Sequence, residues 1–164
     1  MSERLLKLTE RIRDELAELE QLVNRAREAW RRAQQSGDDF YLDSVALNLH
    51  SFYAGLERLF ELIATVVDRN VPQGTSWHQL LLQQMATEIP PARPAVISDG
   101  TRDLLDAYRG FRHVVRNVYT LRFDPVKIQP LVEKAPAVFA QVRRELLAFA
   151  RFLEQQVQAG KEDG

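Results

Sequence analysis

The sequence predicts an all-α protein, folded as an up-and-down bundle of four to five helices. Apolar residues recur at steps of three and four along most of the chain, which is the spacing of one face of a helix. No segment alternates apolar and polar residues for long enough to indicate a strand. Short stretches with Gly or Pro separate the periodic runs, so consecutive helices are expected to pack antiparallel.

The first two helices are the longest periodic runs. Residues 3–35 form the first, with apolar positions separated by charged ones, as in an amphipathic helix. The pattern breaks at Gly37, after which Asp38 or Asp39 can cap the next helix. That helix, residues 39–69, has a wide apolar face and is expected to be the most buried.

Two shorter helices are expected in the middle of the chain. Residues 76–88 form a short helix, and a segment with three prolines follows at residues 89–94, which cannot be helical throughout. The next helix, residues 98–122, begins where Ser98 or Asp99 can cap the exposed amides. Any chemistry of the protein is expected on this helix.

The last helix is expected at residues 134–157, before a polar tail at 158–164. Asp124 and Pro125 mark the boundary after the preceding helix. A chain of 164 residues with 45% hydrophobic residues can bury one core. Residues 1–164 are therefore interpreted as a single domain.

The composition excludes several classes of protein. The chain has 22 basic and 23 acidic residues and a net charge of −1, which excludes a globally basic nucleic-acid binder. It has no cysteine, so disulfides, thiolate metal sites and a cysteine nucleophile are excluded.

The sequence also leads to expectations about cellular location and about cofactors. Charged residues occur in every turn of residues 1–20, so this segment does not resemble a signal peptide or a membrane anchor. A cytoplasmic protein that is not attached to a membrane is expected. His50 and His78 have no second ligand at helical spacing, and neither a metal nor a cofactor is expected.

A stripe of arginines is the main candidate site. Arg109, Arg112, Arg116 and Tyr119 fall within about 80° of one another on a regular helix. Residues 107–122 contain four arginines and no acidic residue, so a positive local field is expected. Arginine can donate two parallel hydrogen bonds to phosphate, and RNA phosphate is the ligand considered. The alternative is that these arginines pair with carboxylates of neighbouring helices.

Two further residues bear on this stripe. His113 follows Arg112 and could serve as a general base near neutral pH, although a lone helical histidine is more often packed or solvated. Glu57 lies near the apolar face of the second helix and is expected to be buried against an arginine.

The motif helix resembles a known family. Its residues 108–119 read Tyr-Arg-Gly-Phe-Arg-His-Val-Val-Arg-Asn-Val-Tyr, which is similar to the signature of HepT-like proteins of the HEPN superfamily. That signature has an arginine, a polar residue, then a histidine and, after one residue, a tyrosine. Arg112, His113 and Tyr119 match the arginine, polar residue and tyrosine, and Asn117 stands where the family has histidine.

The resemblance implies a function as well as a fold. Family members are toxins of bacterial toxin–antitoxin pairs, form homodimers with facing motif helices, and cleave RNA without a metal. Their partner is a minimal nucleotidyltransferase, which in some pairs adds AMP to the motif tyrosine, here Tyr119. The resemblance thus implies Arg112, His113 and Asn117 as the catalytic positions, and an RNA-facing cleft that also includes Arg109 and Arg116.

Asn117 leaves the activity open, because an amide cannot accept a proton near neutral pH. His113 could replace it as the base, or Arg112 and Arg116 could stabilise the reacting phosphate while another group moves the proton. Arg112 and Asn117 would also point about 140° apart on a regular helix. A member that binds RNA, nucleotide or its partner without cutting, and a structural helical adaptor, are the alternatives.

Overall fold

The computed structural model describes residues 2–116 and 123–163, which form helices joined by loops, and it confirms the all-α class. The elements in chain order are α1 (Ser2–Ser36), α2 (Phe40–Ile63), the π-helical turn η1 (Ala64–Asp68), α3 (Trp77–Met85), α4 (Asp99–Arg116) and α5 (Pro125–Asp163). Within the described residues there is no strand, only one isolated bridge between Ile89 and Arg93.

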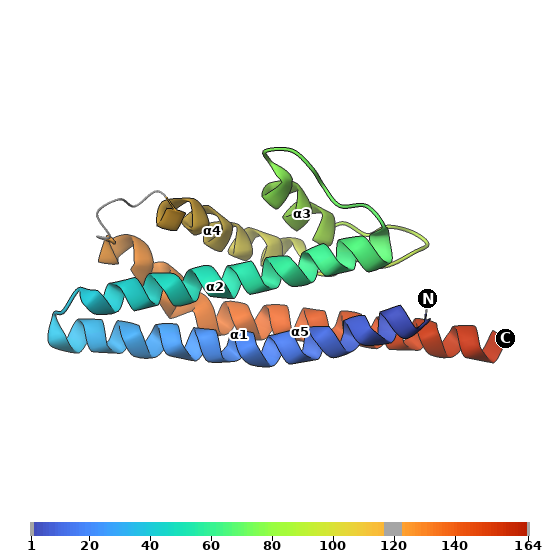
Figure 1. Cartoon of the computed structure of the whole chain (residues 1–164), viewed down its shortest axis with the longest axis horizontal. Helices are drawn as coiled ribbons and strands as arrows, with labels where there is room; N and C mark the ends of the chain where they lie inside the picture. Colours follow the sequence, from blue (N-terminus) through green and yellow to red (C-terminus); the bar gives the residue numbers. More distant parts are fainter. Residues whose placement is uncertain (1, 117–122, 164) are drawn as a thin grey trace.

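The three long helices form an elongated bundle that carries the two shorter ones (Figure 1). Helix α1 packs mainly against α2 and α5, and α4 packs against α2, α3 and α5. The chain reverses direction between α1 and α2 and again between α4 and α5, so the bundle is up-and-down and both termini lie at one end (Figure 1). Helix α3 sits across α2 and α4.

No helix in the described ranges combines the length and the hydropathy that a membrane span requires.

The turn between α1 and α2 forms where glycine and aspartate predicted it. Gly37 has a φ of 70°, a conformation that only glycine adopts without strain. The Asp38 carboxylate accepts a hydrogen bond from the Phe40 amide at 3.0 Å, and Asp39 makes no side-chain cap. Asp38 therefore caps α2.

Helix α2 lies at the centre of the core, as its wide apolar face predicted. Phe52, Leu56, Phe60 and Ile63 are completely buried, because this helix contacts α1 on one side and α3, α4 and α5 on others. The Phe52 ring meets the Tyr108 ring of α4 edge-on, with the centroids 5.7 Å apart. The position of α4 on the bundle thus depends on the α2 core.

Gly55 allows α1 and α2 to approach closely. A Cβ atom at this position would lie 2.6 Å from Leu19 Cδ2, and Leu19 is fully buried. We expect Gly55→Val to lower the free energy of unfolding by about 1–3 kcal/mol through overpacking, as measured by urea denaturation. Gly110→Ala is the control, because a Cβ there meets nothing within 4 Å and should stabilise α4 by up to about 1 kcal/mol. Equal effects of the two substitutions would contradict this prediction.

The second and third helices end earlier than predicted. The helix expected over residues 39–69 is α-helical only over Phe40–Ile63. The chain then widens into η1 and stops at Arg69, whose φ is 54°, because a left-handed residue terminates a helix. The helix expected over 76–88 covers Trp77–Met85, since the chain turns toward the proline-rich segment after Ala86.

The start and the end of the last helix were predicted wrongly. Helix α5 begins at Pro125, not at 134, and it continues through the expected tail to Asp163. Proline is well suited to the first position of a helix, and the Asp124 carboxylate caps the Val126 amide at 3.0 Å. Pro130 and Pro136 lie inside the helix, where each removes one hydrogen bond. Burial of Ile128, Val132 and Ala135 against the bundle offsets that loss.

The motif helix α4 is held by a cap at its first turn. The Ser98 hydroxyl accepts a hydrogen bond from the Thr101 amide at 3.1 Å, as predicted for a cap. Glu145 of α5 accepts hydrogen bonds from the Ser98 amide and the Thr101 hydroxyl, each at 2.6 Å. These contacts attach the start of α4 to α5 and set the direction in which α4 crosses α2. The described part of α4 ends at Arg116.

Candidate functional site

The predicted catalytic arginine is anchored to the core helix. The Arg112 guanidinium of α4 donates through Nη1 to Oε1 of Glu57 on α2. The side chains of Arg112 and Glu57 are 18% and 5% exposed, so the carboxylate is buried and the guanidinium is partly accessible. This contact confirms the expectation that Glu57 is buried against an arginine.

A histidine from α3 completes the cluster. His78 Nδ1 lies 2.7 Å from Oε2 of Glu57 and 3.3 Å from Nη1 of Arg112. The Trp77 ring lies beside the imidazole with the centroids 3.6 Å apart and a tilt of 33°. We name Glu57, His78 and Arg112 the α2–α3–α4 cluster, since each side chain comes from a different helix.

Arg112 also has a donor that the cluster does not use. Its Nε is buried and has no hydrogen-bond partner among the described residues. A buried donor without an acceptor costs about 1–3 kcal/mol, and a catalytic role is one of the reasons for which proteins retain such a group. The cluster thus holds a guanidinium at a cost to stability.

The arginines of the predicted stripe differ in the residues that they contact. Arg109 Nε lies 2.7 Å from Oδ1 of Asp106, one turn earlier on α4, while Arg112 binds Glu57. Arg116 is exposed, and it forms no ion pair with another described residue. The acidic partners Asp106 and Glu57 lie outside residues 107–122. The local positive charge is therefore lower than the composition of that stretch predicts.

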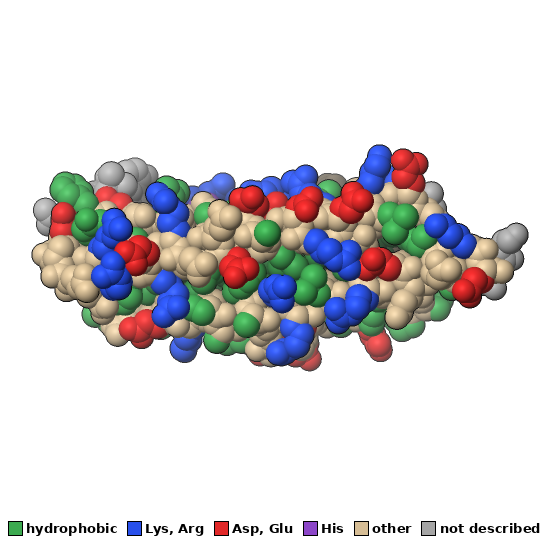
Figure 2. All heavy atoms as spheres, turned by 90° about the horizontal axis from the view of Figure 1, so that it is seen from below, with side chains coloured by type: hydrophobic (Ala, Val, Ile, Leu, Met, Phe, Trp, Pro, Cys, Tyr) green, Lys and Arg blue, Asp and Glu red, His purple; other side chains and the backbone are tan. Residues whose placement is uncertain are grey.

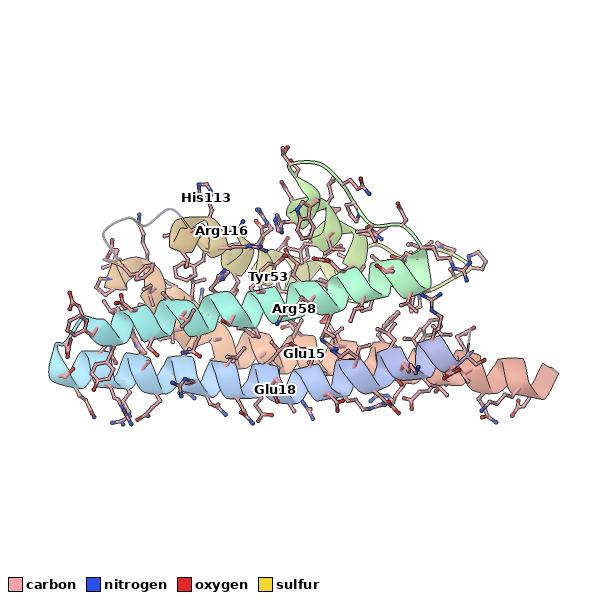
Figure 3. The ribbon with its side chains drawn as sticks, in the orientation of Figure 1. Glu15, Glu18, Tyr53, Arg58, His113 and Arg116 are labelled. Carbon is pink, nitrogen blue, oxygen red and sulfur yellow. The ribbon has the colours of Figure 1, made fainter. Side chains whose placement is uncertain are left out.

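The other motif residues lie apart from the cluster or outside the described chain. His113 is exposed, and its ring projects from α4 on the side away from α2 (Figure 3). It follows Arg112 in sequence but is rotated about 100° around the helix. Asn117 and Tyr119, the other two predicted positions, lie outside the described residues.

His50 reports the positive charge on this side of the molecule. Its pKa is lowered from the usual 6.5, mainly by burial and then by the charges of Arg112 and Arg116. The imidazole is therefore neutral at neutral pH. Because the folded state holds this proton less tightly than the unfolded state, stability is fully present above about 6.5 and falls as the pH decreases below it.

We expect Arg116→Gln to raise the pKa of His50, since one of the two repelling charges is removed. The rise should be partial, because burial and Arg112 remain. NMR titration of the imidazole ring protons measures it, with Arg4→Gln on α1 as a charge-matched control. An unchanged or lower His50 midpoint in Arg116→Gln would contradict the prediction.

Tyr53 lies beneath the site, between α2 and α4 (Figure 3). Its side chain is buried, and burial followed by the nearby Glu57 charge raises the pKa of its phenol well above the usual 10. The hydroxyl therefore stays protonated at any physiological pH. Tyr53 can donate a hydrogen bond in this site but cannot act as a base.

The opposite face of the protein is not a candidate for phosphate binding. On the face formed by α1 and α5, basic and acidic side chains are interspersed (Figure 2). Ion pairs such as Arg13 with Glu154, which joins α1 to α5, neutralise much of this charge. Mixed charge at this spacing produces no field of one sign.

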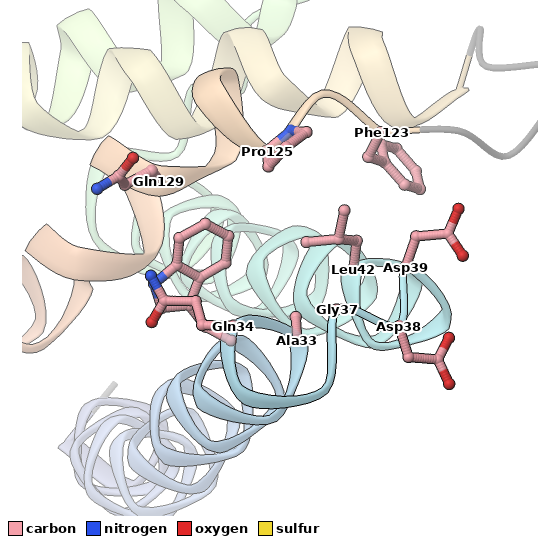
Figure 4. Close-up of a pocket in the computed structure, with 10 residues that line it drawn as sticks. Ala33, Gln34, Gly37, Asp38, Asp39, Leu42, Phe123, Pro125 and Gln129 are labelled. Atoms are coloured by element: carbon pink, nitrogen blue, oxygen red, sulfur yellow. The ribbon is translucent and has the colours of Figure 1, made fainter.

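A cavity of 510 Å³ lies where the α1–α2 turn meets the start of α5 (Figure 4). Its described lining is mainly apolar, with Leu42, Phe123 and Pro125, and it includes the carboxylates of Asp38 and Asp39. No lysine or arginine of the described chain lines it, so it does not suit an anionic ligand. Over the same described ranges, no three potential ligands among His, Asp and Glu gather closely enough to hold a metal ion.

His78 is the residue that the sequence did not mark as functional. Its two partners are distant in sequence, because Glu57 is 21 residues away and Arg112 is 34 residues away. No local spacing signals such a contact.

Comparison with known proteins supports the family resemblance. A family model described as HepT-like protein matches residues 44–153, which include α2 from its fifth residue, α3, α4 and most of α5. All three residues of the α2–α3–α4 cluster lie in the matched region. Neither a curated protein nor a solved structure matches the chain. The match covers more than half of the sequence, and the protein belongs to the HepT-like family.

Proposed function

We propose that this HepT-like protein binds RNA and cleaves it without a metal, as the toxin of a toxin–antitoxin pair. One observation carries the proposal: the motif arginine, Arg112, is partly exposed and fixed by a buried carboxylate next to an imidazole. A fixed guanidinium suits a phosphodiester because it can stabilise the charge that develops on the phosphate oxygens. Arg109 and Arg116 supply further phosphate contacts. The family motif implies Arg112, His113 and Asn117 as the catalytic positions.

A homodimer is part of this proposal. Phe40 and Leu47 stand seven residues apart on one face of α2, and their exposed fractions are 76% and 63%. Val114 on α4 is a further exposed apolar residue, at 40%. Apolar side chains exposed along one helix favour association, and a second copy would bring two motif helices together.

The proposal also includes control of the toxin by a partner protein. We propose a minimal nucleotidyltransferase as the antitoxin, with transfer of AMP to the Tyr119 hydroxyl. A bulky anionic group on the motif helix would compete with RNA phosphate for Arg112 and Arg116. Modification and RNA binding are then mutually exclusive.

A second function, RNA or partner binding without cleavage, is favoured by a different observation. Asn117 replaces the motif histidine, and Asp106 and Glu57 neutralise two of the three arginines. If all the arginines serve only such ion pairs, the protein is a structural adaptor.

RNA binding tests these functions through Arg116. We expect Arg116→Gln to weaken binding of a labelled single-stranded RNA and to reduce the slope of log affinity against log salt by about 0.7 for each phosphate that is no longer neutralised. Fluorescence anisotropy at several salt concentrations measures this, with Arg144→Gln on the exposed face of α5 as the charge-matched control. Unchanged binding in an Arg109→Gln, Arg116→Gln double variant would leave only the adaptor.

Cleavage is measured with the same RNA in EDTA. Cutting by the wild type supports the ribonuclease. Salt-dependent binding without cutting assigns the second function.

A further inference from the structure

We propose that His78, oriented by Glu57, is the proton acceptor for RNA cleavage and acts beside Arg112. This inference rests on the proposed ribonuclease function and names the group that replaces the missing motif histidine. It makes His78 a catalytic residue from α3, outside the motif helix. Glu57 is a positioning residue, since it acts through His78 and Arg112.

The geometry of Glu57 and His78 is that of an oriented base. The distance between Nδ1 and the carboxylate oxygen is 2.7 Å, within the range of a charge-assisted hydrogen bond. Since Glu57 is 5% exposed and His78 is 22% exposed, the carboxylate lies on the inner side of the ring. Because an ionised carboxylate can only accept a hydrogen bond, Nδ1 carries the proton that is donated to Glu57. The unprotonated Nε2 lies on the far side of the imidazole.

A buried carboxylate at Nδ1 has two effects on the reaction. It selects the tautomer in which Nε2 can accept a proton, and it stabilises the imidazolium that then forms. The adjacent Trp77 ring, with its centroid 3.6 Å from that of the imidazole, restricts rotation of the base. Both contacts prepare His78 before a substrate arrives.

Arg112 is placed to act on the same phosphodiester. Nη1 lies 3.3 Å from His78 Nδ1, and because both nitrogens are donors this is a close approach and not a hydrogen bond. Nη1 is engaged by Glu57 and Nε is buried, so only the accessible part of the guanidinium can meet a phosphate. One carboxylate thus holds the base and the cation next to each other.

The reaction balances with these groups alone. His78 Nε2 takes the proton of the ribose 2′-hydroxyl, and O2′ forms a bond to phosphorus while the bond from phosphorus to O5′ breaks. The electron pair of that bond leaves on O5′, which takes a proton from water, and the imidazolium returns its proton to solvent. The products are a 2′,3′-cyclic phosphate and a 5′-hydroxyl, and Arg112 stabilises the charge on the phosphate oxygens in between.

The two other histidines are less suited to this role. His113 projects from α4 away from α2 (Figure 3), so it does not share the Glu57 carboxylate with Arg112. His50 is neutral and lies near Arg112 and Arg116, but no carboxylate of the described residues orients it. Among the histidines, His78 is the one that combines a buried carboxylate at one nitrogen with an arginine at close range within the described chain.

The experiment compares RNA cleavage in EDTA by the full-length wild type, His78→Asn and the surface control Gln79→Ala. The asparagine amide can still donate to Glu57, so this variant keeps the fold and lacks the base. We expect kcat to fall at least ~100-fold in His78→Asn, which is the usual contribution of a general base, with RNA affinity and thermal unfolding unchanged. In His78→Ala, added imidazole should restore part of the rate, and Glu57→Gln should lower kcat more than it raises KM.

The outcomes separate this inference from the proposed function. Cleavage by the wild type that survives in His78→Asn, or that disappears in His113→Asn instead, overturns the role of His78 and leaves the ribonuclease standing. No cleavage by the wild type overturns the ribonuclease and the role of His78 together. A 2′-deoxy substitution at the cut site must abolish cleavage, because the nucleophile is then missing.

Discussion

Arg112→Met is expected to lower the free energy of unfolding by about 3 kcal/mol and to abolish RNA cleavage. The substitution leaves the Glu57 carboxylate, which is 5% exposed, without its guanidinium partner. Breaking a buried ion pair in this way costs about 3–5 kcal/mol. We expect a loss at the lower end of this range, because His78 still donates a hydrogen bond to Glu57. Urea denaturation followed by circular dichroism measures the decrease.

A second substitution separates the structural role of Arg112 from its functional role. In Glu57→Met with Arg112→Met, neither charge remains buried, and replacing both partners of such a pair by apolar groups is often close to neutral. We expect the double variant to recover most of the stability and none of the RNA affinity. Recovery of RNA binding together with stability would show that Arg112 serves only the fold.

Arg93→Met is expected to have an effect on stability at least as large, about 3–5 kcal/mol. The side chains of Arg93 and Asp68 are 0% and 1% exposed, with a closest distance of 2.5 Å. The guanidinium also donates to the carbonyls of Gln84, Thr87 and Pro94. Its removal would leave a buried carboxylate and three carbonyls without this donor, and would free the loop between α3 and α4. The midpoint of urea denaturation measures this effect.

The matched control for Arg93 is Arg102→Met. Arg102 binds Asp99 and Asp103, whose side chains are 75% and 73% exposed, and such surface pairs contribute about 0–1 kcal/mol. The same chemical change should therefore have little effect at Arg102. Similar decreases in stability for both variants would mean that burial of the Asp68 pair does not determine its contribution.

Helices with strong local signals could be predicted closely from the sequence. Helix α1 was expected over residues 3–35 and covers Ser2–Ser36, because its apolar spacing and Gly37 are local features. The start of α5 was predicted wrongly, although Asp124 and Pro125 were recognised as a boundary. Pro130 and Pro136 lie inside the helix, where proline is unfavourable unless other contacts compensate for it. The contacts of buried Ile128 and Val132 decide that segment, and those contacts depend on the assembled bundle.

The sequence by itself determined the helical class, the bounds of α1 and the family, and it placed Arg112 on the motif helix. Only the tertiary structure decided what Arg112 contacts, since Glu57 and His78 are 55 and 34 residues away. Spacing of three and four residues specifies which side chains share a helix face. It does not specify which faces of different helices meet, because that depends on how all the helices pack around one core.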